Sequence, residues 1–276
     1  MKIFRKTSEL EPNLVSIKDK GQSIGLVLTM GNLHDGHLSL IREAQLHNEF
    51  VICSIFVNPT QFNNKDDFNF YPKTIDDDIS KLEKIGCNLL FLPSTKDIYP
   101  KGLEKKKIVN NFRGILCHKF RPGHFDGVTT VVDLFFNMIK PTNSYFGEKD
   151  FQQVKIIQDL VKINHHNIKI IPCPSVRDKE GMSLSSRNSK FSNNQLKIFN
   201  VLGNKIKEHI NLLMQNKINN FDQLKKELLE NNINKIDYLE IRNENNLEIT
   251  KNYSEARLFI ALYIGDIRII DNFKLY

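Results

Sequence analysis

Two histidines three positions apart, His34 and His37, are the first residues whose type and spacing could perform chemistry. They lie in TMGNLHDGHLSLI (29–41), between an apolar run and a helical pattern, with Gly31 and Gly36 beside them. If both fall in the first helical turn, this spacing places their rings on one face. The free N–H groups and partial positive charge of a helix N-terminus attract phosphate. Phosphate binding, a structural turn and a metal pair remain open, although no third metal ligand stands nearby in the sequence.

Two later segments also carry groups that suit an anion. In GEKDFQQ (147–153), Lys149 can reach a phosphate as a point charge, while a capping acid beside an exposed lysine is the structural alternative. In GMSLSSRN (181–188), two serine hydroxyls precede Arg187, whose guanidinium can bind phosphate with two parallel hydrogen bonds. A polar interdomain linker explains the composition of the second segment equally well.

Two further segments lie where a substrate pocket is expected. NPTQF (58–62) places Gln61 at the end of an apolar run, and RPGHFDG (121–127) places His124 just before a helical pattern. A single glutamine or histidine is more often structural than functional. The three aspartates at 76–78 open a helical pattern, where they complement the helix dipole, and one of them could hold a magnesium ion.

Strands and helices alternate in the part of the chain that must position these residues. Apolar runs predict strands at 23–29, 50–57, 88–93, 143–147 and 168–173. Amphipathic patterns predict helices at 36–47, 74–85, 126–139 and 150–163. Continuous apolar runs suit parallel strands covered on both faces, so residues 1–175 are expected to form a doubly wound α/β domain.

The pattern changes after residue 175. Helices are expected at 192–215 and 219–231, followed by strands at 238–243, 256–264 and 267–272. Helices followed by antiparallel strands indicate a smaller α+β domain over residues 176–276. The boundary falls in PCPSVRDKEG, which has two prolines, a glycine and several charges.

Composition narrows the class of protein. Hydrophobic residues make up 40% and charged residues 26% of the 276 residues, which is typical of a globular chain. No stretch approaches 18 consecutive apolar residues, and the N-terminal residues lack the apolar core of a signal peptide. We therefore expect a cytoplasmic protein with no membrane partner. Four cysteines without ligand spacing are expected to be reduced, buried thiols: Cys53, Cys87, Cys117 and Cys173.

The net charge of +7 raises the question of nucleic-acid binding. Residues 1–175 contain 23 basic and 19 acidic side chains, and residues 176–276 contain 16 and 13, so the surplus is spread along the chain. The dense run Lys105–Lys107 is too short for a binding tail and is typical of a solvated surface. A small anionic substrate explains the mild surplus equally well, and no nucleic-acid partner is expected.

Taken in order, six segments resemble the pantothenate synthetases (pantoate–β-alanine ligases). They are TMGNLHDGHLSLI, SIFVNPTQF, YPKTIDDDISKLEKIG, RPGHFDGVTTVV, YFGEKDFQQ and SVRDKEGMSLSSRN, and they extend over about residues 22–190. The later YLEIRN and ALYIGDIRIIDN resemble the closing strands of the same family. The family belongs to the HIGH-motif nucleotidyltransferases, which implies a Rossmann-like domain and a small C-terminal domain that closes over the site. The segment with Arg187 corresponds to the mobile KMSKS-type loop of that superfamily.

The resemblance implies a role for each matching residue. The catalytic set implied is His34, His37, Lys149 and Arg187. The implied ATP contacts are Met30, Gly31, His34, His37, Gly147, Lys149, Asp150, Val176, Leu184, Ser185, Ser186 and Arg187. The substrate pocket for pantoate and β-alanine is assigned Asn58, Gln61, His124 and Gln153. Asp78 aligns with a carboxylate associated with magnesium. One departure is Leu184, where the family usually has methionine, a swap that conserves apolar volume.

The implied function is the ATP-dependent ligation of pantoate and β-alanine to pantothenate through a pantoyl adenylate. ATP would be a substrate and Mg²⁺ a cofactor, and the family implies a homodimer. No residue stands out as a base for the β-alanine amine. The alternatives are a HIGH-motif nucleotidyltransferase with a different acceptor and a non-catalytic nucleotide- or RNA-binding protein.

Overall fold

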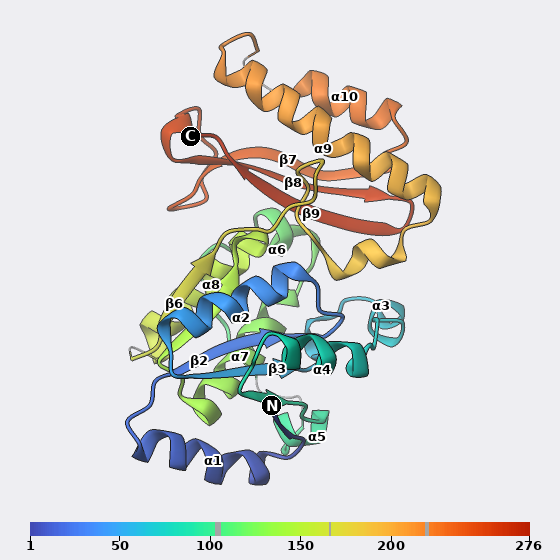
Figure 1. Ribbon diagram of the computed structural model, residues 1–276. Coiled ribbons are helices and arrows are strands. Elements are labelled where there is room, and N and C mark those ends of the chain that lie inside the picture. The colour runs from blue at the N-terminus through green and yellow to red at the C-terminus, as the bar shows by residue number, and fades with distance from the viewer. Residues whose placement is uncertain (103–105, 166, 219–220) are drawn as a thin grey trace. The chain divides into compact units, whose positions relative to one another are not determined.

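A computed structural model describes residues 1–102, 106–165, 167–218 and 221–276 (Figure 1). Lys105 of the basic run and residues 219–220 of the second C-terminal helix expected from the sequence lie outside the described residues. The described chain divides into two compact units. The first unit contains residues 1–148 and 152–174, and the second contains residues 149–151 and 175–276.

The first unit is built on a parallel sheet. Its strands are β1 (Lys2–Phe4), β2 (Ile24–Thr29), β3 (Phe50–Ile55), β4 (Leu89–Phe91), β5 (Asn143–Gly147) and β6 (Lys169–Cys173). Among the described residues the strand order is β1-β4-β3-β2-β5-β6, and every pairing is parallel. The doubly wound, Rossmann-like fold expected from the sequence is confirmed.

Strand order reverses next to β2. The chain moves from β2 to β3 and β4 on one side and later places β5 on the other side, where Val27 of β2 pairs with Tyr145. Crevices at such a switch point, beyond the carboxyl ends of the strands, are where ligands bind in open α/β sheets. The segments after β2 and β5 are those that carry the histidine pair and GEKDFQQ, so the topology brings their first residues to one edge of the sheet.

Helices and short 3₁₀ turns connect these strands. They are α1 (Thr7–Asp19), α2 (Asp35–His47), η1 (Pro59–Gln61), α3 (Lys65–Asn69), α4 (Ile75–Lys84), α5 (Thr95–Ile98), α6 (Leu116–Phe120), α7 (His124–Ile139), η2 (Glu148–Asp150) and α8 (Phe151–Asn164).

Two apolar layers hold the sheet of the first unit. Ile41 of α2 and Leu82 of α4 belong to one buried cluster with Cys53 and Leu90. Side chains alternate along a strand, so the neighbouring Phe91 faces the other side, where its ring lies 6.2 Å from that of Phe135 in α7. Burial on both faces explains why these strands have continuous apolar sequences.

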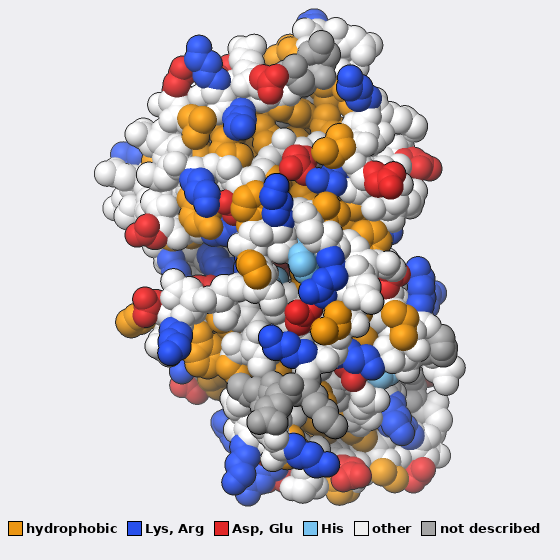
Figure 2. Space-filling view, turned by 180° about the vertical axis from the view of Figure 1, so that it is seen from behind, with side chains coloured by type: hydrophobic (Ala, Val, Ile, Leu, Met, Phe, Trp, Pro, Cys, Tyr) orange, Lys and Arg blue, Asp and Glu red, His pale blue; other side chains and the backbone are white. Residues whose placement is uncertain are grey.

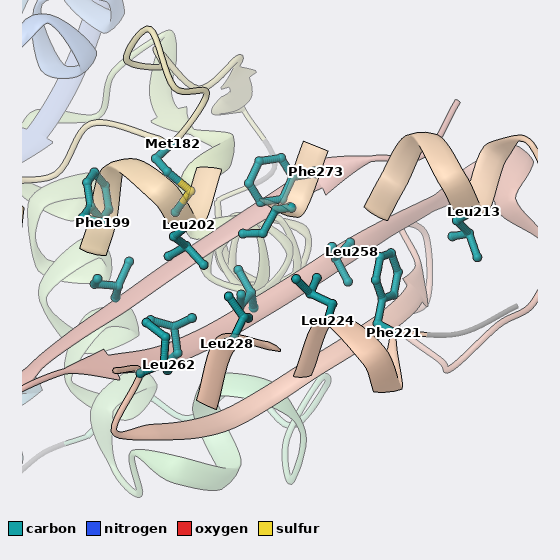
Figure 3. Close-up of a cluster of buried hydrophobic side chains, with 14 of the residues drawn as sticks. Met182, Phe199, Leu202, Leu213, Phe221, Leu224, Leu228, Leu258, Leu262 and Phe273 are labelled. Atoms are coloured by element: carbon teal, nitrogen blue, oxygen red, sulfur yellow. The ribbon is translucent and has the colours of Figure 1, made fainter. Parts of the chain in front are cut away.

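The second unit has an antiparallel sheet in the order β7-β8-β9. Its elements are η3 (Ser186–Lys190), α9 (Asn193–Met214), α10 (Asp222–Glu230), β7 (Lys235–Asn243), η4 (Tyr253–Glu255), β8 (Ala256–Ile264) and β9 (Ile267–Lys274). Figure 3 shows side chains of both helices meeting those of the strands in one apolar cluster, including Leu202, Leu224 and Leu262. The smaller α+β architecture expected at the C-terminal end is confirmed.

Surface charge, the cysteines and the lengths of the helices were also subjects of expectations from the sequence. The face drawn in Figure 2 has Lys and Arg side chains scattered among Asp and Glu, without one continuous basic patch. All four cysteines are buried and free of disulfide bonds. Within the described ranges, no helix is both long enough and apolar enough to cross a membrane.

Candidate active site

The two histidines form the N-terminal cap of α2. His34 is the N-cap residue, and its Nδ1 accepts a hydrogen bond from the backbone N–H of Gly36 at 3.2 Å. The Nδ1 of His37 accepts from the backbone N–H of His34 at 3.4 Å, and the two ring centroids are 4.1 Å apart. A neutral imidazole whose Nδ1 accepts carries its proton on Nε2. Both rings are therefore set as Nε2–H donors at the positive end of a 13-residue helix.

A compact polar cluster lies around Gln61 in the first unit. Asn58 is buried, and its side-chain amide donates to Gln61 Oε1 at 3.0 Å and to the Gly127 carbonyl at 3.1 Å. The Gln61 amide in turn donates to Met30 Sδ at 2.9 Å. The structure thus brings Met30, at the end of β2, together with the glutamine assigned to pantoate.

Tyr99 completes this cluster, and the sequence analysis did not identify it. Its hydroxyl donates to Asn58 Oδ1 at 2.7 Å, and burial raises the pKa of the phenol. Tyr99 follows the short helix α5, far from Asn58 in the sequence. A buried tyrosine in IYPKG gives no sequence signal that distinguishes it from a core residue.

His124 supports the backbone of the same cluster. Its Nδ1 lies 2.8 Å from the Gln61 carbonyl oxygen, and its Nε2 lies 3.0 Å from a guanidinium nitrogen of Arg121. A neutral ring that donates from Nδ1 and accepts at Nε2 satisfies both contacts. This geometry gives His124 a use in fixing Gln61, and its assignment to the substrate pocket stays a prediction.

Two neighbouring glutamines after β5, Gln152 and Gln153, have different environments. Gln152 is buried, and its amide donates to the carbonyls of Phe112 and Ile115. Gln153, the one assigned to pantoate, is only partly buried. A Cβ placed on Gly147 would meet no atom within 4 Å, so the end of β5 has open space beside it.

The assigned residues Lys149, Asp150, Val176 and 184–187 belong to the second unit. Lys149 Nζ lies 3.8 Å from an Asp150 carboxylate oxygen, and the Lys149 carbonyl accepts from the Asn272 amide at 3.0 Å. In the loop, Leu184 donates its N–H to the Val176 carbonyl at 2.9 Å. The cap of the short 3₁₀ turn η3 is Ser185, whose hydroxyl accepts from the N–H of Arg187.

Asp271 fixes the start of this loop, and it was not identified from the sequence. Its buried carboxylate accepts from the N–H of Ser183 at 2.7 Å and from the Ser183 hydroxyl at 2.6 Å. Arg177 adds a third donor at 3.1 Å. Ser183 is therefore fixed to β9, and Leu184 to Arg187 follow directly after this fixed residue.

Asp78, the carboxylate associated with magnesium by resemblance, is completely buried and makes hydrogen bonds with the backbone of residues 32 and 33. Among the described residues, no group of three or more His, Cys, Asp or Glu side chains is arranged to hold a metal ion. Both oxygens of the Asp78 carboxylate already have hydrogen-bond donors.

Comparison with known proteins gives one consistent result. Residues 2–274 match the family model described as pantoate-beta-alanine ligase. The chain is 38% identical over 277 residues to a pantothenate synthetase of Caldicellulosiruptor saccharolyticus, covering 99% of this chain and 98% of that protein. It is 42% identical over 260 residues to one of Clostridium botulinum strain Kyoto, covering 93% and 92%.

Solved structures agree with this result. The pantothenate synthetase of Thermus thermophilus is similar over the full length of both chains, with a TM-score of 0.91 at 32% identity. The pantoate-beta-alanine ligase of Francisella tularensis, complexed with beta-gamma ATP and beta-alanine, has a TM-score of 0.85 at 38% identity. That alignment covers 100% of this chain and 98% of the other.

Proposed function

This chain belongs to the pantoate–β-alanine ligase family, and on that premise we propose which of its residues carry out the reaction. The enzyme joins pantoate and β-alanine to pantothenate with ATP, through a pantoyl adenylate, and releases AMP and pyrophosphate. The observation that carries the assignment of roles is the histidine cap of α2, which lies at the switch point of the sheet.

In the first step, a carboxylate oxygen of pantoate attacks the α-phosphorus of ATP, and the bond to pyrophosphate breaks. Negative charge moves onto the phosphate oxygens during this step. The Nε2–H groups of His34 and His37 donate hydrogen bonds to these oxygens, and the α2 dipole adds positive potential. Lys149 and Arg187 contribute full positive charges to the same oxygens.

In the second step, the amine of β-alanine attacks the acyl carbon of the adenylate. The C–N bond forms, AMP leaves with the electron pair of the C–O bond, and the amine loses a proton. Positioning supplies much of the acceleration, because two bound reactants avoid the entropy cost of a collision. Gln61 and Gln153 hold pantoate in this proposal, since neutral amides can donate to the carboxylate and accept from the hydroxyls.

ATP contacts are also proposed for Met30, Gly31, Gly147, Asp150, Val176, Leu184, Ser185 and Ser186. Residues 1–175 then form the nucleotide- and pantoate-binding domain, and residues 176–276 form a lid domain that begins with the loop. Mg²⁺, when bound together with ATP, would supply positive charge to the phosphates. We also propose assembly as a homodimer, which the family resemblance implies, and location in the cytoplasm, which the sequence pattern favours.

The deciding experiment is exchange of labelled pyrophosphate into ATP, which measures reversal of the first step. We expect exchange only when pantoate is present, and pantothenate only after β-alanine is added. Exchange in the absence of pantoate would indicate another acceptor. If no exchange occurs under any condition, the result would favour a nucleotide-binding protein that does not catalyse this reaction.

A further inference from the structure

We propose that Asp78 is a positioning residue that clamps the turn before the histidine pair, and that it is not a ligand of Mg²⁺. The inference rests on the proposed function only where it names ATP phosphate as the group that the histidines bind. The contacts that support it lie entirely within the first unit.

Both oxygens of the Asp78 carboxylate already accept hydrogen bonds from the protein. Oδ1 accepts from the N–H of Leu33 at 2.7 Å, and Oδ2 accepts from the N–H of Asn32 at 3.0 Å. The hydroxyl of Thr74 donates to Oδ2 at 3.2 Å. The residue has 0% exposure. Mg²⁺ needs near-octahedral oxygen ligands at about 2.0–2.1 Å and normally keeps several waters, and a fully buried carboxylate surrounded by N–H groups offers no place for them.

The backbone shape explains why an anion is held here. Gly31 has φ = 84° and Asn32 has φ = 51°, so two successive residues adopt the left-handed conformation. Turns of this kind point consecutive N–H groups into one concavity that attracts an anion. In this chain the Asp78 carboxylate fills that concavity. The N–H groups of Asn32 and Leu33 are therefore already bonded, and ATP phosphate must be bound further along, at the histidine rings and the start of α2.

Lys81, which lies one helical turn after Asp78 in α4, also binds the backbone turn at residues 31–33. Its ammonium donates to the Leu33 carbonyl at 2.7 Å and lies 2.6 Å from an Asp77 carboxylate oxygen. Residues three apart on a helix share a face, so Asp78 and Lys81 together bind both the N–H and the carbonyl of Leu33. A metal ion at Asp78 would also have to approach the positive charge of Lys81.

The contacts of Asp78 affect the histidine pair because the clamped residues are adjacent to it in the chain. Leu33 immediately precedes His34, whose extended conformation and ring orientation define the cap of α2. If the turn at 31–33 shifts, both rings shift with it. A displacement of about 1 Å in a reacting geometry can lower the rate by about 100-fold.

The test compares Asp78→Asn with Asp76→Asn. The variant Asp78→Asn keeps the side-chain shape but turns an amide donor toward one of the two backbone donors. Asp76 is a matched control, because it carries the same charge in the same helical turn but is exposed. Three quantities are measured: turnover, the Mg²⁺ concentration for half-maximal pyrophosphate exchange, and the hydrogen-exchange rates of the Asn32 and Leu33 amides without ligands.

For Asp78→Asn we expect turnover to fall by about 10- to 100-fold, half-saturation by Mg²⁺ to stay within about twofold, and both amides to exchange at least about tenfold faster. Asp76→Asn should leave all three unchanged. A tenfold rise in the Mg²⁺ requirement with unchanged amide protection would overturn the proposal, as would wild-type turnover in Asp78→Asn. Amide exchange needs no activity, so it tests the clamp even if the wild type shows no pantoate-dependent exchange.

Lys81→Met provides a second test if Asp78→Asn does not fold. It removes the donor to the Leu33 carbonyl and leaves Asp78 in place. We expect lower turnover with an unchanged Mg²⁺ requirement. If Asp78 held the metal, loss of the nearby ammonium would instead lower the Mg²⁺ concentration needed, and that result would contradict the clamp.

Discussion

At the scale of single residues, hydrogen bonding determines what the histidine pair can do. Each Nδ1 accepts a backbone N–H, so each ring presents Nε2–H as a donor. This arrangement suits a phosphate whose negative charge grows during the reaction. A zinc ion binds an unprotonated ring nitrogen and needs further ligands. Because each Nε2 carries a proton in this arrangement, the geometry favours phosphate over the metal alternative.

The first prediction concerns His37→Ala. Removal of one donor aimed at developing charge should lower turnover by about 10²- to 10³-fold, and Lys149→Ala should have an effect of similar size. Both variants should remain folded, because neither side chain belongs to the apolar core. Steady-state AMP formation measures turnover, and circular dichroism checks the fold. His47→Ala, which removes an exposed histidine from the last turn of the same helix, is the control. Turnover within threefold of wild type in folded His37→Ala would remove that residue from the mechanism.

The second prediction concerns Tyr99→Phe, which removes the donor to Asn58 Oδ1 without changing the ring. Asn58 then loses one of the bonds that orient it toward Gln61. We expect KM for pantoate to rise by about three- to tenfold while KM for ATP is unchanged, since one neutral hydrogen bond is worth about 1 kcal/mol. Tyr145→Phe removes another hydroxyl, which accepts from the Asn48 amide, and it should not change either KM. A rise in both KM values for Tyr99→Phe would indicate general loosening instead of a pantoate effect.

At the scale of elements, the sequence predicted the strands that have apolar runs and the helices that have amphipathic patterns, and it missed elements that are short or weakly patterned. The strands expected at 143–147 and 256–264 coincide with β5 and β8. Helix α1 was not expected, because Pro12 lies inside it and its polar and apolar residues are weakly separated, although Leu10 and Leu14 are buried. Strand β1 has only three residues, too few for a pattern.

The same limit applies to the candidate site. Residues in ordered motifs, such as His34 and Gln61, could be named from the sequence. Supporting residues such as Tyr99 and Asp271 could not, because their partners are distant in the chain. Asp78 shows the difference most clearly: its alignment suggests a metal, whereas its contacts join α4 to the turn after β2.

The third prediction concerns the packing of α7 against η1. A Cβ on Gly127 would lie 2.4 Å from the Thr60 carbonyl oxygen, so Gly127→Ala must push the 3₁₀ turn that carries Gln61 away from the helix. We expect a loss of about 1–3 kcal/mol in the free energy of unfolding and a raised KM for pantoate. Urea titration and steady-state kinetics measure the two effects. Asn137→Ala, on the exposed part of α7, should show neither, and wild-type behaviour of Gly127→Ala would contradict this close approach of helix and turn.

At the scale of the whole molecule, the charges are mixed in sign and each unit has its own apolar core. The surplus of seven positive charges is divided along the sequence, with four in residues 1–175 and three in residues 176–276. Clustered lysines and arginines are typical of a nucleic-acid-binding surface, and on the face drawn in Figure 2 they are interspersed with acidic residues. The two units each have an apolar core, and therefore a single unfolding temperature need not describe both.

The fourth prediction concerns stability at high pH. Burial raises the pKa of Cys87 to about 11 and that of Cys173 to about 12, from an ordinary value near 9. Between pH 9 and 11 the unfolded thiol of Cys87 is ionised while the folded thiol keeps its proton. The unfolded state then binds fewer protons, so the free energy of unfolding falls as pH rises. Below pH 9 both states are protonated, and this contribution is fully present.

Cys87→Ser isolates that effect, because serine does not titrate in this range and can keep the bonds to the Val51 and Leu89 carbonyls. Guanidinium titrations at pH 8, 9, 10 and 11, read by circular dichroism, should show the wild type losing about 2 kcal/mol more than Cys87→Ser between pH 9 and 11. Other groups that titrate in both proteins cancel in this difference. Parallel pH profiles for the two proteins would show that the Cys87 thiol ionises as readily in the folded state as in the unfolded state.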